Sequence, residues 1–529
     1  MARGRAGNGH ALCDPRPRGT SQARHPHFGR NGGAVIHALL WGLLSVSTPP
    51  ESAPTRFIVQ APDETTTVSE AYTYTGRVYV FLGEPDGRAP RQGPDWFRPQ
   101  PFFSIEVQEW DPRTELVLDE RAMGYPGPIS SLPEQDWAVQ AVLRGPDTSR
   151  AGSGPGTLFG TATTHRIGPR SGDIRLSIDL IEPTRSQPEV DGIEWVRLPS
   201  PMLSESLGRP VVHRAAVMPP SNYDPDAERT WPVVYVIGGF PGSLDGAPMT
   251  KWMWGQTELR EEAFIVHLDA ECINGHHAFV DSAGNGPRGT ALVREFIPHL
   301  EATWNMRTDP AGRLLTGHSS GGWSSLWLQI NWPDFFGGTW STAPDPVDFR
   351  AFQTVDIYSE GANAFFDEQG ERRPVGRARG RVLIWYDDFV GMEHVLGDGG
   401  QIRSFDWTFS PVDEHGRAQR LIDSRTGVID PRVAEAWKQF DINLVLQDRW
   451  PEIGPSLAGK IHIIGGREDT FYLEAALDLL QRTMEDLGSD AEITVVPGAD
   501  HSNFMNLRRR REIAREMLEQ SSTGASTRP

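Results

Sequence analysis

The sequence is poor in cysteine, in lysine and in long apolar runs. Its 529 residues include two cysteines, Cys13 and Cys272, which are too few and too isolated for a disulfide framework. Lysine and arginine together number 51 against 70 acidic residues, and the formal net charge is −19. Recognition of a phosphate backbone requires a basic surface, so the composition excludes a nucleic-acid-binding protein. No run of about 20 apolar residues occurs, so we expect no stable membrane anchor.

The clearest apolar segment near the N-terminus spans residues 34–46 and reads AVIHALLWGLLSV. It follows a basic segment whose composition predicts disorder, and it precedes the small and turn-forming residues STPPESAPT. A basic region, an apolar core and a zone of small residues are typical of a secretory signal. A buried helix is the alternative. We therefore interpret residues 1–55 as a disordered basic segment and signal-like region of a secreted or periplasmic protein, with a mature chain beginning between about residue 46 and residue 56.

Residues 56–190 are predicted to form a domain of short strands. Apolar and polar residues alternate, as in DIRLSIDL, which places Ile174, Leu176, Ile178 and Leu180 on one face. Segments rich in Gly, Pro and Asp separate the strands, and no helical periodicity is present. This pattern indicates a β-sandwich domain of an immunoglobulin-like kind. No residue pattern in this domain indicates a catalytic site.

From residue 195 to about 520 the pattern changes to strands that alternate with helices. Such alternation favours an α/β domain with a mainly parallel sheet that is covered on both faces. Strand-like runs include VVYVIGG, FIVHL, RLLTG, GTWST, KIHIIGG and EITVV. About residues 345–455, between two of these runs, lack clean periodicity and are too many for a simple crossover. We expect them to be an insertion beside the active site.

The segment GHSSG, residues 317–321, fits the pattern G-x-S-x-G and places Ser319 where a strand meets a helix. A serine hydroxyl becomes a nucleophile only when a base takes its proton and an acid orients that base. Asp469, in GGREDTFY, and His501, in PGADHSNF, follow the last two strand-like runs in the order this fold requires. Each residue also has a non-catalytic alternative, because Ser319 and Asp469 could cap helices and His501 could lie in a solvated loop.

Glu468 is the alternative acid, because it directly precedes Asp469 in the same loop. Asp469 is favoured, since its shorter side chain would hold the imidazole with fewer rotatable bonds. The tetrahedral intermediate also needs two fixed N–H donors. We assign them to the backbone of Ser320 and of Phe240 in GGFPG, where Gly239 would allow close approach. A turn that merely requires glycine is the alternative.

Four residues are candidates for substrate contacts. Gly239 adjoins the expected oxyanion donor, and Trp252, beside Trp254, could form an aromatic wall or belong to the core. His277 and Asn285 lie in the polar loop NGHHAFVDSAGNGPRG, which follows a strand of the parallel series.

The same loop holds His276, His277 and Asp281, which could suggest a metal site. No further ligands stand at regular spacing, so a solvated loop is favoured and we expect neither a metal nor another cofactor.

The chain from about residue 205 to 520 resembles the putative esterase family of α/β-hydrolases, which includes esterase D, enterochelin esterases, feruloyl esterases and mycobacterial mycolyltransferases. The resemblance rests on YDPDAERTWPVVYVIGGFPGS, GHSSGGWSSLWL, GGREDTFYLEAA and PGADHSNF. Some members carry a β-sandwich ahead of the catalytic domain. This chain departs from the family's pattern in two ways that affect the expected substrate more than the expected chemistry. The glycine pair after the oxyanion strand lacks the histidine common in relatives, and the insertion before Asp469 is unusually long.

The resemblance implies an α/β-hydrolase fold in which Ser319, Asp469 and His501 take the positions of nucleophile, acid and base. It places Phe240 and Ser320 at the oxyanion donors. The residues and the resemblance together predict a serine esterase that works through an acyl-enzyme. An acyltransferase, thioesterase or peptidase using the same site remains an alternative, as does a non-catalytic binding protein on this scaffold. The expected partner is a small-molecule or polymer-linked ester, and a homo-oligomer formed through the β-sandwich stays open.

Overall fold

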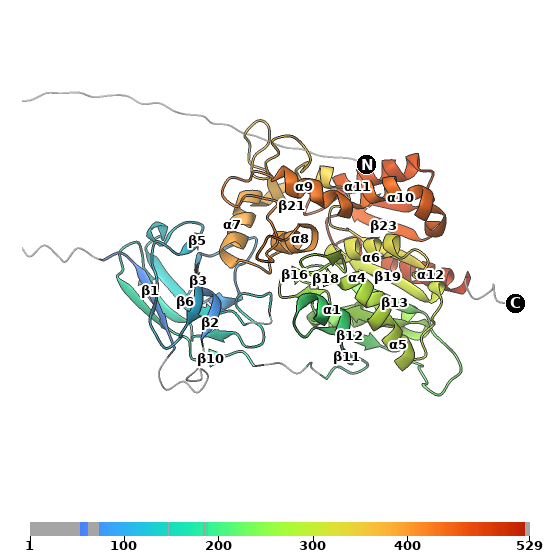
Figure 1. Ribbon diagram of the computed structural model, residues 1–529, viewed down its shortest axis with the longest axis horizontal. Coiled ribbons are helices and arrows are strands. Elements are labelled where there is room, and N and C mark those ends of the chain that lie inside the picture. Colours follow the sequence, from blue (N-terminus) through green and yellow to red (C-terminus); the bar gives the residue numbers. More distant parts are fainter. Residues whose placement is uncertain (1–52, 62–72, 146–147, 184–186, 188, 524–529) are drawn as a thin grey trace, which may run out of the picture. The chain divides into compact units, whose positions relative to one another are not determined.

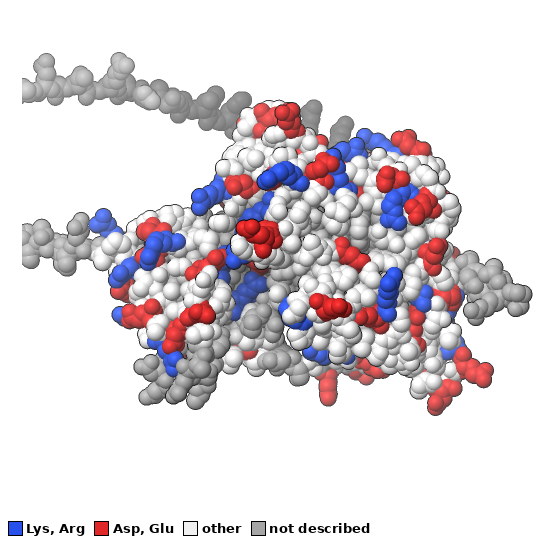
Figure 2. Space-filling model, viewed as in Figure 1, with Lys and Arg blue, Asp and Glu red and all other residues white. Residues whose placement is uncertain are grey.

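The computed structural model describes residues 53–61, 73–145, 148–183, 187 and 189–523. All of these belong to the second of two compact units, which spans Ser52–Pro529. The basic segment, the signal-like run and Cys13 lie outside the described residues. Within the described part, no helix is long and apolar enough to cross a bilayer. On the face drawn in Figure 2, Lys and Arg side chains are interspersed with Asp and Glu.

The N-terminal part of the described chain consists of two β-sheets (Figure 1). The smaller sheet has the order β4-β1-β9, and the larger has the order β10-β7-β6-β2-β3-β5, with β8 paired to β6. The strands are β1 (Arg56–Gln60), β2 (Tyr74–Gly83), β3 (Phe102–Trp110), β4 (Leu116–Leu118), β5 (Met123–Tyr125), β6 (Gln135–Leu143), β7 (Leu158–Phe159), β8 (Thr163–Ile167), β9 (Asp173–Ser177) and β10 (Leu180–Ile181).

Alternate residues of both sheets meet in one apolar core. Phe57 and Val59 of β1 pack there with Val78 and Val80 of β2, as the period of two predicts. The prediction for Leu180 was wrong, because its side chain is 42% exposed. The chain leaves β9 at Ser177 and joins the other sheet as β10, so the alternation does not continue.

The following part of the chain contains the predicted α/β sheet, with the order β11-β12-β14-β13-β19-β20-β23-β24. At one edge of the sheet, β11 pairs with β12 and β12 pairs with β14 in antiparallel fashion. All the other neighbouring strands in this order are parallel. These strands are β11 (Glu194–Pro199), β12 (Val212–Met218), β13 (Val233–Ile237), β14 (Phe264–Leu268), β19 (Arg313–His318), β20 (Gly338–Thr342), β23 (Ile461–Gly466) and β24 (Glu492–Val496). The mainly parallel α/β sheet is thus confirmed.

Helices cover both faces of this sheet (Figure 1). Val233, Tyr235 and Ile237 of β13 contact one helical layer, and Val234 and Val236 contact the other. The first layer comprises a π-helical turn (Leu292–Phe296), α5 (Ile297–Thr303) and α6 (Ser320–Asn331). The second comprises α2 (Ala247–Trp254), α3 (Leu259–Glu262) and α12 (Leu507–Thr523). Burial of each large apolar side chain contributes about 1.5–3 kcal/mol, which holds the strand ends in place.

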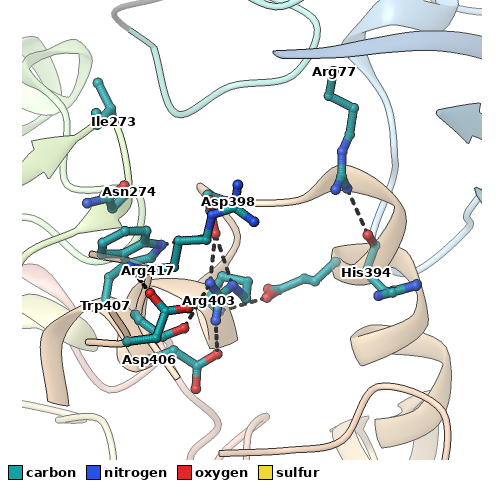
Figure 3. Close-up of polar contacts among 12 residues, drawn as sticks. Arg77, Ile273, Asn274, His394, Asp398, Arg403, Asp406, Trp407 and Arg417 are labelled. Atoms are coloured by element: carbon teal, nitrogen blue, oxygen red, sulfur yellow. Dashed lines mark hydrogen bonds and ion pairs between the residues drawn. The ribbon is translucent and has the colours of Figure 1, made fainter. Parts of the chain in front are cut away.

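The segment between β20 and β23 folds into a hairpin and several helices. It contains β21 (Pro374–Ala378), β22 (Arg381–Trp385), α7 (Tyr386–Leu396), α8 (Gln401–Phe409), α9 (Pro431–Trp437) and α10 (Ile442–Leu457). Ion pairs fix the loop between α7 and α8: Arg403 donates to Asp398 at 3.0 Å and to Asp406 at 2.6 Å (Figure 3). The Nε1–H of Trp407 donates to the same Asp398 carboxylate at 3.0 Å.

The N-terminal sheets pack against this inserted segment. Tyr79, Phe81 and Phe102 belong to an apolar cluster that also contains residues of α7 and α8. The Tyr79 hydroxyl donates to the carbonyl of Leu396 at 2.5 Å, at the end of α7. The Arg77 guanidinium donates to the carbonyl of His394 at 2.9 Å (Figure 3). The two regions therefore share both core and hydrogen bonds.

Candidate active site

Ser319 occupies a sharp turn between β19 and α6, with φ 59° and ψ −123°. A positive φ is uncommon outside glycine, and such a backbone costs of order 1–3 kcal/mol. The flanking glycines permit the turn, because a Cβ on Gly317 would lie 2.1 Å from the carbonyl oxygen of Gly321. A Cβ on Gly321 would lie 2.0 Å from the carbonyl oxygen of Ile237. The G-x-S-x-G spacing is therefore a packing requirement of the strand-to-helix turn.

His501 and Asp469 come together from the loops after β24 and β23. The Nδ1 of His501 lies 2.8 Å from Oδ2 of Asp469, whose side chain is 1% exposed. A ring N–H that donates to a carboxylate fixes the tautomer and leaves Nε2 as an acceptor. The neighbouring Glu468 is exposed, so Asp469 is the carboxylate that orients this imidazole. The ring of Phe471 meets the imidazole edge-on at 5.0 Å and limits its rotation.

A second carboxylate, Asp345, faces the serine turn. The Ser319 hydroxyl donates to its Oδ1 at 3.3 Å, and the Ser320 hydroxyl donates to its Oδ2 at 2.5 Å. Gln401, the first residue of α8, donates to the same Oδ2 at 3.3 Å and connects the inserted segment to the site. Burial raises the pKa of Asp345 to about 6, against the lowering effect of the hydrogen bond from Ser320.

The hydroxyl of Ser319 is held loosely. Hydrogen bonds from hydroxyl to carboxylate are commonly 2.5–2.8 Å, so the 3.3 Å contact with Asp345 is weak. In the part of the chain that the structure describes, no hydrogen bond joins Ser319 to His501.

The expected oxyanion donors flank the same turn. The N–H of Ser320 opens α6 and so has no acceptor within the helix. The loop after β13 approaches closely, because a Cβ on Gly239 would lie 3.0 Å from the carbonyl oxygen of His318 and 3.1 Å from Cβ of Ser319. A side chain at Gly239 would require the serine turn to shift by a few tenths of an ångström, so glycine suits this approach. Phe240 is the next residue of this loop.

A cleft of about 830 Å³ opens next to these groups. Its lining includes Gly239, His318 and Ser502, which are the chain neighbours of Phe240, Ser319 and His501. The walls are largely apolar and consist mainly of Met249, Trp252, Met253, Trp254 and Met505. Trp252 is 59% exposed at this cleft, so it is a wall and not core, whereas Trp254 is buried.

His277 and Asn285 do not reach this cleft. His277 is buried and lines a separate small cavity with Arg288. Asn285 is buried against α8, where its amide donates to Thr408 at 3.3 Å. The expectation of a solvated loop was also wrong, since His276 and His277 are 3% and 2% exposed.

His276 approaches the strand that carries the oxyanion loop, because its Nε2 lies 3.1 Å from the carbonyl oxygen of Gly238. Among the described residues, no three His, Cys, Asp or Glu side chains are grouped so as to hold a metal ion.

The order of the eight-stranded sheet and the turn at Ser319 together define an α/β-hydrolase fold. Residues 204–428 match the model of the family described as "Putative esterase". The matched residues make up less than half of the chain, and over this part the chain is similar to that family of esterases. The matched residues include Phe240, Ser319 and Asp345 and end before Asp469 and His501.

A search of curated proteins finds no match. Among solved structures, a ferulic acid esterase is 14% identical, with coverage of 62% of this chain and 98% of that chain and a TM-score of 0.37. An S-formylglutathione hydrolase from Agrobacterium tumefaciens is 14% identical, with 63% and 98% coverage and a TM-score of 0.37. FphF, a fluorophosphonate-binding serine hydrolase of Staphylococcus aureus, is 11% identical, with 62% and 98% coverage and a TM-score of 0.36. At these TM-scores the likenesses support nothing further about this chain.

Proposed function

We propose that the protein hydrolyses carboxylic esters with Ser319 as nucleophile, His501 as general base and Asp469 as the acid that orients the base. The observation that carries the proposal is the 2.8 Å contact between His501 and Asp469 beside a serine with a positive φ. A buried carboxylate fixes the imidazole and stabilises the imidazolium that forms. The strained turn holds the serine next to His318, which lines the cleft.

The reaction proceeds in two halves. Ser319 turns from Asp345 to His501, whose Nε2 takes the hydroxyl proton as Oγ attacks the ester carbonyl carbon. The N–H groups of Ser320 and Phe240 donate to the resulting oxyanion. Collapse breaks the bond to the alcohol oxygen, and this oxygen receives the proton from the imidazolium. Water then attacks the acyl-enzyme with the same base, and the acid leaves as Ser319 regains its proton.

Labelling with a fluorophosphonate probe tests the activation of the serine. The wild-type protein is expected to be labelled at Ser319 and to release 4-nitrophenol from short-chain 4-nitrophenyl esters. Ser319→Ala should fold, escape labelling and lose most of the turnover, because binding and oxyanion contacts alone supply a small part of the rate. Equal turnover by the variant would remove Ser319 from the mechanism.

The acid is tested by two adjacent substitutions. Asp469→Asn removes the acceptor that fixes the tautomer of His501 and should lower kcat by orders of magnitude. Glu468→Gln is the matched control, because the same charge is lost one residue away on an exposed side chain. It should change kcat by less than about tenfold. The reverse ranking would make Glu468 the acid.

We also propose that residues 56–190 form an immunoglobulin-like β-sandwich domain, that residues 195–520 form the catalytic domain with an insertion at about 345–455, and that the protein is exported. The shared apolar core of the two N-terminal sheets supports the first point. The signal-like run supports the last. Mass spectrometry of the protein from its native host decides export, and a chain that retains residues 1–45 would refute it.

A further inference from the structure

The cleft beside the active site contains a buried arginine that lacks an anionic partner. Arg510 lies in the first turns of α12 and is 5% exposed. Its Nη1 donates to the carbonyl of Met253 at 3.2 Å. Its Nε is buried without a hydrogen-bond partner. Across the described chain no carboxylate pairs with this side chain, whereas its neighbours Arg508 and Arg509 pair with Glu512 at the surface.

The other charges at the cleft do not neutralise Arg510. Arg150 and Asp245, which also line it, pair with each other at 2.9 Å. Burial lowers the pKa of His267 to about 4 and that of His318 to about 3, so both imidazoles are neutral at pH 7. Among the described residues that line the cleft, Arg510 is therefore the charged side chain without a neutralising partner.

A buried guanidinium without a counter-ion is costly, because it has lost hydration and has gained no ion pair. Burial lowers the pKa of Arg510, which reflects that cost. The contact with the Trp252 ring, at 5.2 Å, offsets it only in part. An anionic ligand that entered the cleft would supply the missing partner. The Arg510 side chain lines the cleft, and a carboxylate there could accept a charge-assisted hydrogen bond from the guanidinium.

We propose that Arg510 is a specificity-determining residue that binds a carboxylate carried by the ester substrate, away from the bond that is cleaved. This inference rests on the proposed esterase function of the same site. The cleft extends from Gly239 and His318, at the reacting groups, to Arg510 on α12. Its apolar walls suit a hydrocarbon or aromatic spacer between the scissile ester and the anion. The substrate class is thus an ester with a free carboxylate at the far end of an apolar spacer.

Paired substrates test the proposal on the wild-type protein. One series consists of mono-4-nitrophenyl esters of adipic, suberic and sebacic acids, each compared with its methyl-capped neutral form. A second pair carries the charge on the leaving group, 4-acetoxybenzoate against its methyl ester. We expect the anionic member of at least one pair to have a kcat/KM about tenfold to a hundredfold higher, the range that charge-assisted hydrogen bonds give. Release of the phenol is followed by absorbance.

Variants then assign the preference to one side chain. Arg510→Gln should raise KM for the preferred anionic ester about tenfold or more and leave KM and kcat for the neutral ester nearly unchanged. Arg510→Lys should keep part of the preference, because the positive charge remains while the planar guanidinium is lost. Arg509→Gln is the matched control on the same helix and should keep the full preference. Thermal unfolding of each variant confirms the native fold.

The outcomes separate the two proposals. If neutral esters are hydrolysed and no anionic ester is preferred in either series, the role of Arg510 is refuted and the esterase function stands. A preference that survives in Arg510→Gln also refutes the role. If the wild-type protein hydrolyses no ester and resists the fluorophosphonate probe, the esterase function fails and the substrate class fails with it.

Discussion

Replacement of Asp345 by asparagine should change the pH dependence of stability in a defined direction. The side chain is 7% exposed and accepts hydrogen bonds from Ser319 and Ser320. Asparagine has nearly the same shape, and its oxygen and amide can serve both hydroxyls, since a serine oxygen also accepts. The variant therefore removes a titrating group and keeps the packing.

The magnitude follows from the pKa of Asp345, which burial raises from 3.8 to about 6. Between these values the folded protein binds a proton that the unfolded chain has released, so stability falls as pH rises. About two units at about 1.4 kcal/mol each amount to ~3 kcal/mol. Relative to wild type, Asp345→Asn should gain up to that amount between pH 4 and pH 7, and the difference should be constant above the folded pKa.

Urea unfolding of both proteins at half-unit intervals from pH 4 to pH 8 measures the effect. The quantity of interest is the free energy of unfolding of the variant minus that of wild type at each pH. Other raised carboxyls, such as Glu393 with a pKa of about 7 and Asp269 with a pKa of about 6, occur in both proteins and cancel. A difference that stays flat, or that falls as pH rises, would show that the pKa of Asp345 is not raised and would refute the reasoning.

Three further predictions follow from particular contacts. Asp345→Asn should change kcat by less than about tenfold, because it does not orient His501; a loss of orders of magnitude in ester turnover would make Asp345 a catalytic acid. Gly317→Ala should abolish stable folding or activity through the 2.1 Å clash with Gly321, whereas Gly391→Ala, with 3.6 Å of room inside a helix, should be neutral or stabilising in thermal unfolding. Deletion through residue 190 should cause aggregation by exposing the α7 surface that Tyr79 and Phe102 cover, and a soluble, fully active product by size-exclusion chromatography and ester assay would show the regions to be independent.

Strong periodicity made much of the fold predictable. Apolar residues recur at helical spacing after β23 and form the buried face of α11 (Glu474–Asp486), where Ala476, Leu477, Leu480 and Met484 are buried. The strand-to-helix context of Ser319 was predictable for the same reason, since apolar runs of different period meet there. The alternation of apolar and polar residues does not reveal which sheet a strand joins. For this reason Leu180 was wrongly placed on the same buried face as Ile178.

The polar loop at 274–289 shows the opposite case. Its composition indicated solvent exposure, but α8 covers it: Asn285 bonds to Thr408, which lies 123 residues later in the chain. A Cβ on Gly275 would lie 2.7 Å from Cβ of Ser404, so the two segments are in close contact. Local sequence contains no signal for a cover supplied by a distant insertion.

Asp345 was missed although a signal was present. It follows β20 in STAPDP, at the carboxyl end of a parallel strand, where ligand-binding residues gather in open α/β sheets. In the chain order of nucleophile, acid and base, the acid follows one of the later strands. That order assigns no role to a second carboxylate such as Asp345. What distinguishes the two is environment. Asp469 accepts the ring N–H of His501, whereas Asp345 receives two serine hydroxyls. Because the two carboxyls have such different partners, we propose different roles for them: Asp469 orients the base, and Asp345 accepts the resting hydroxyl of Ser319.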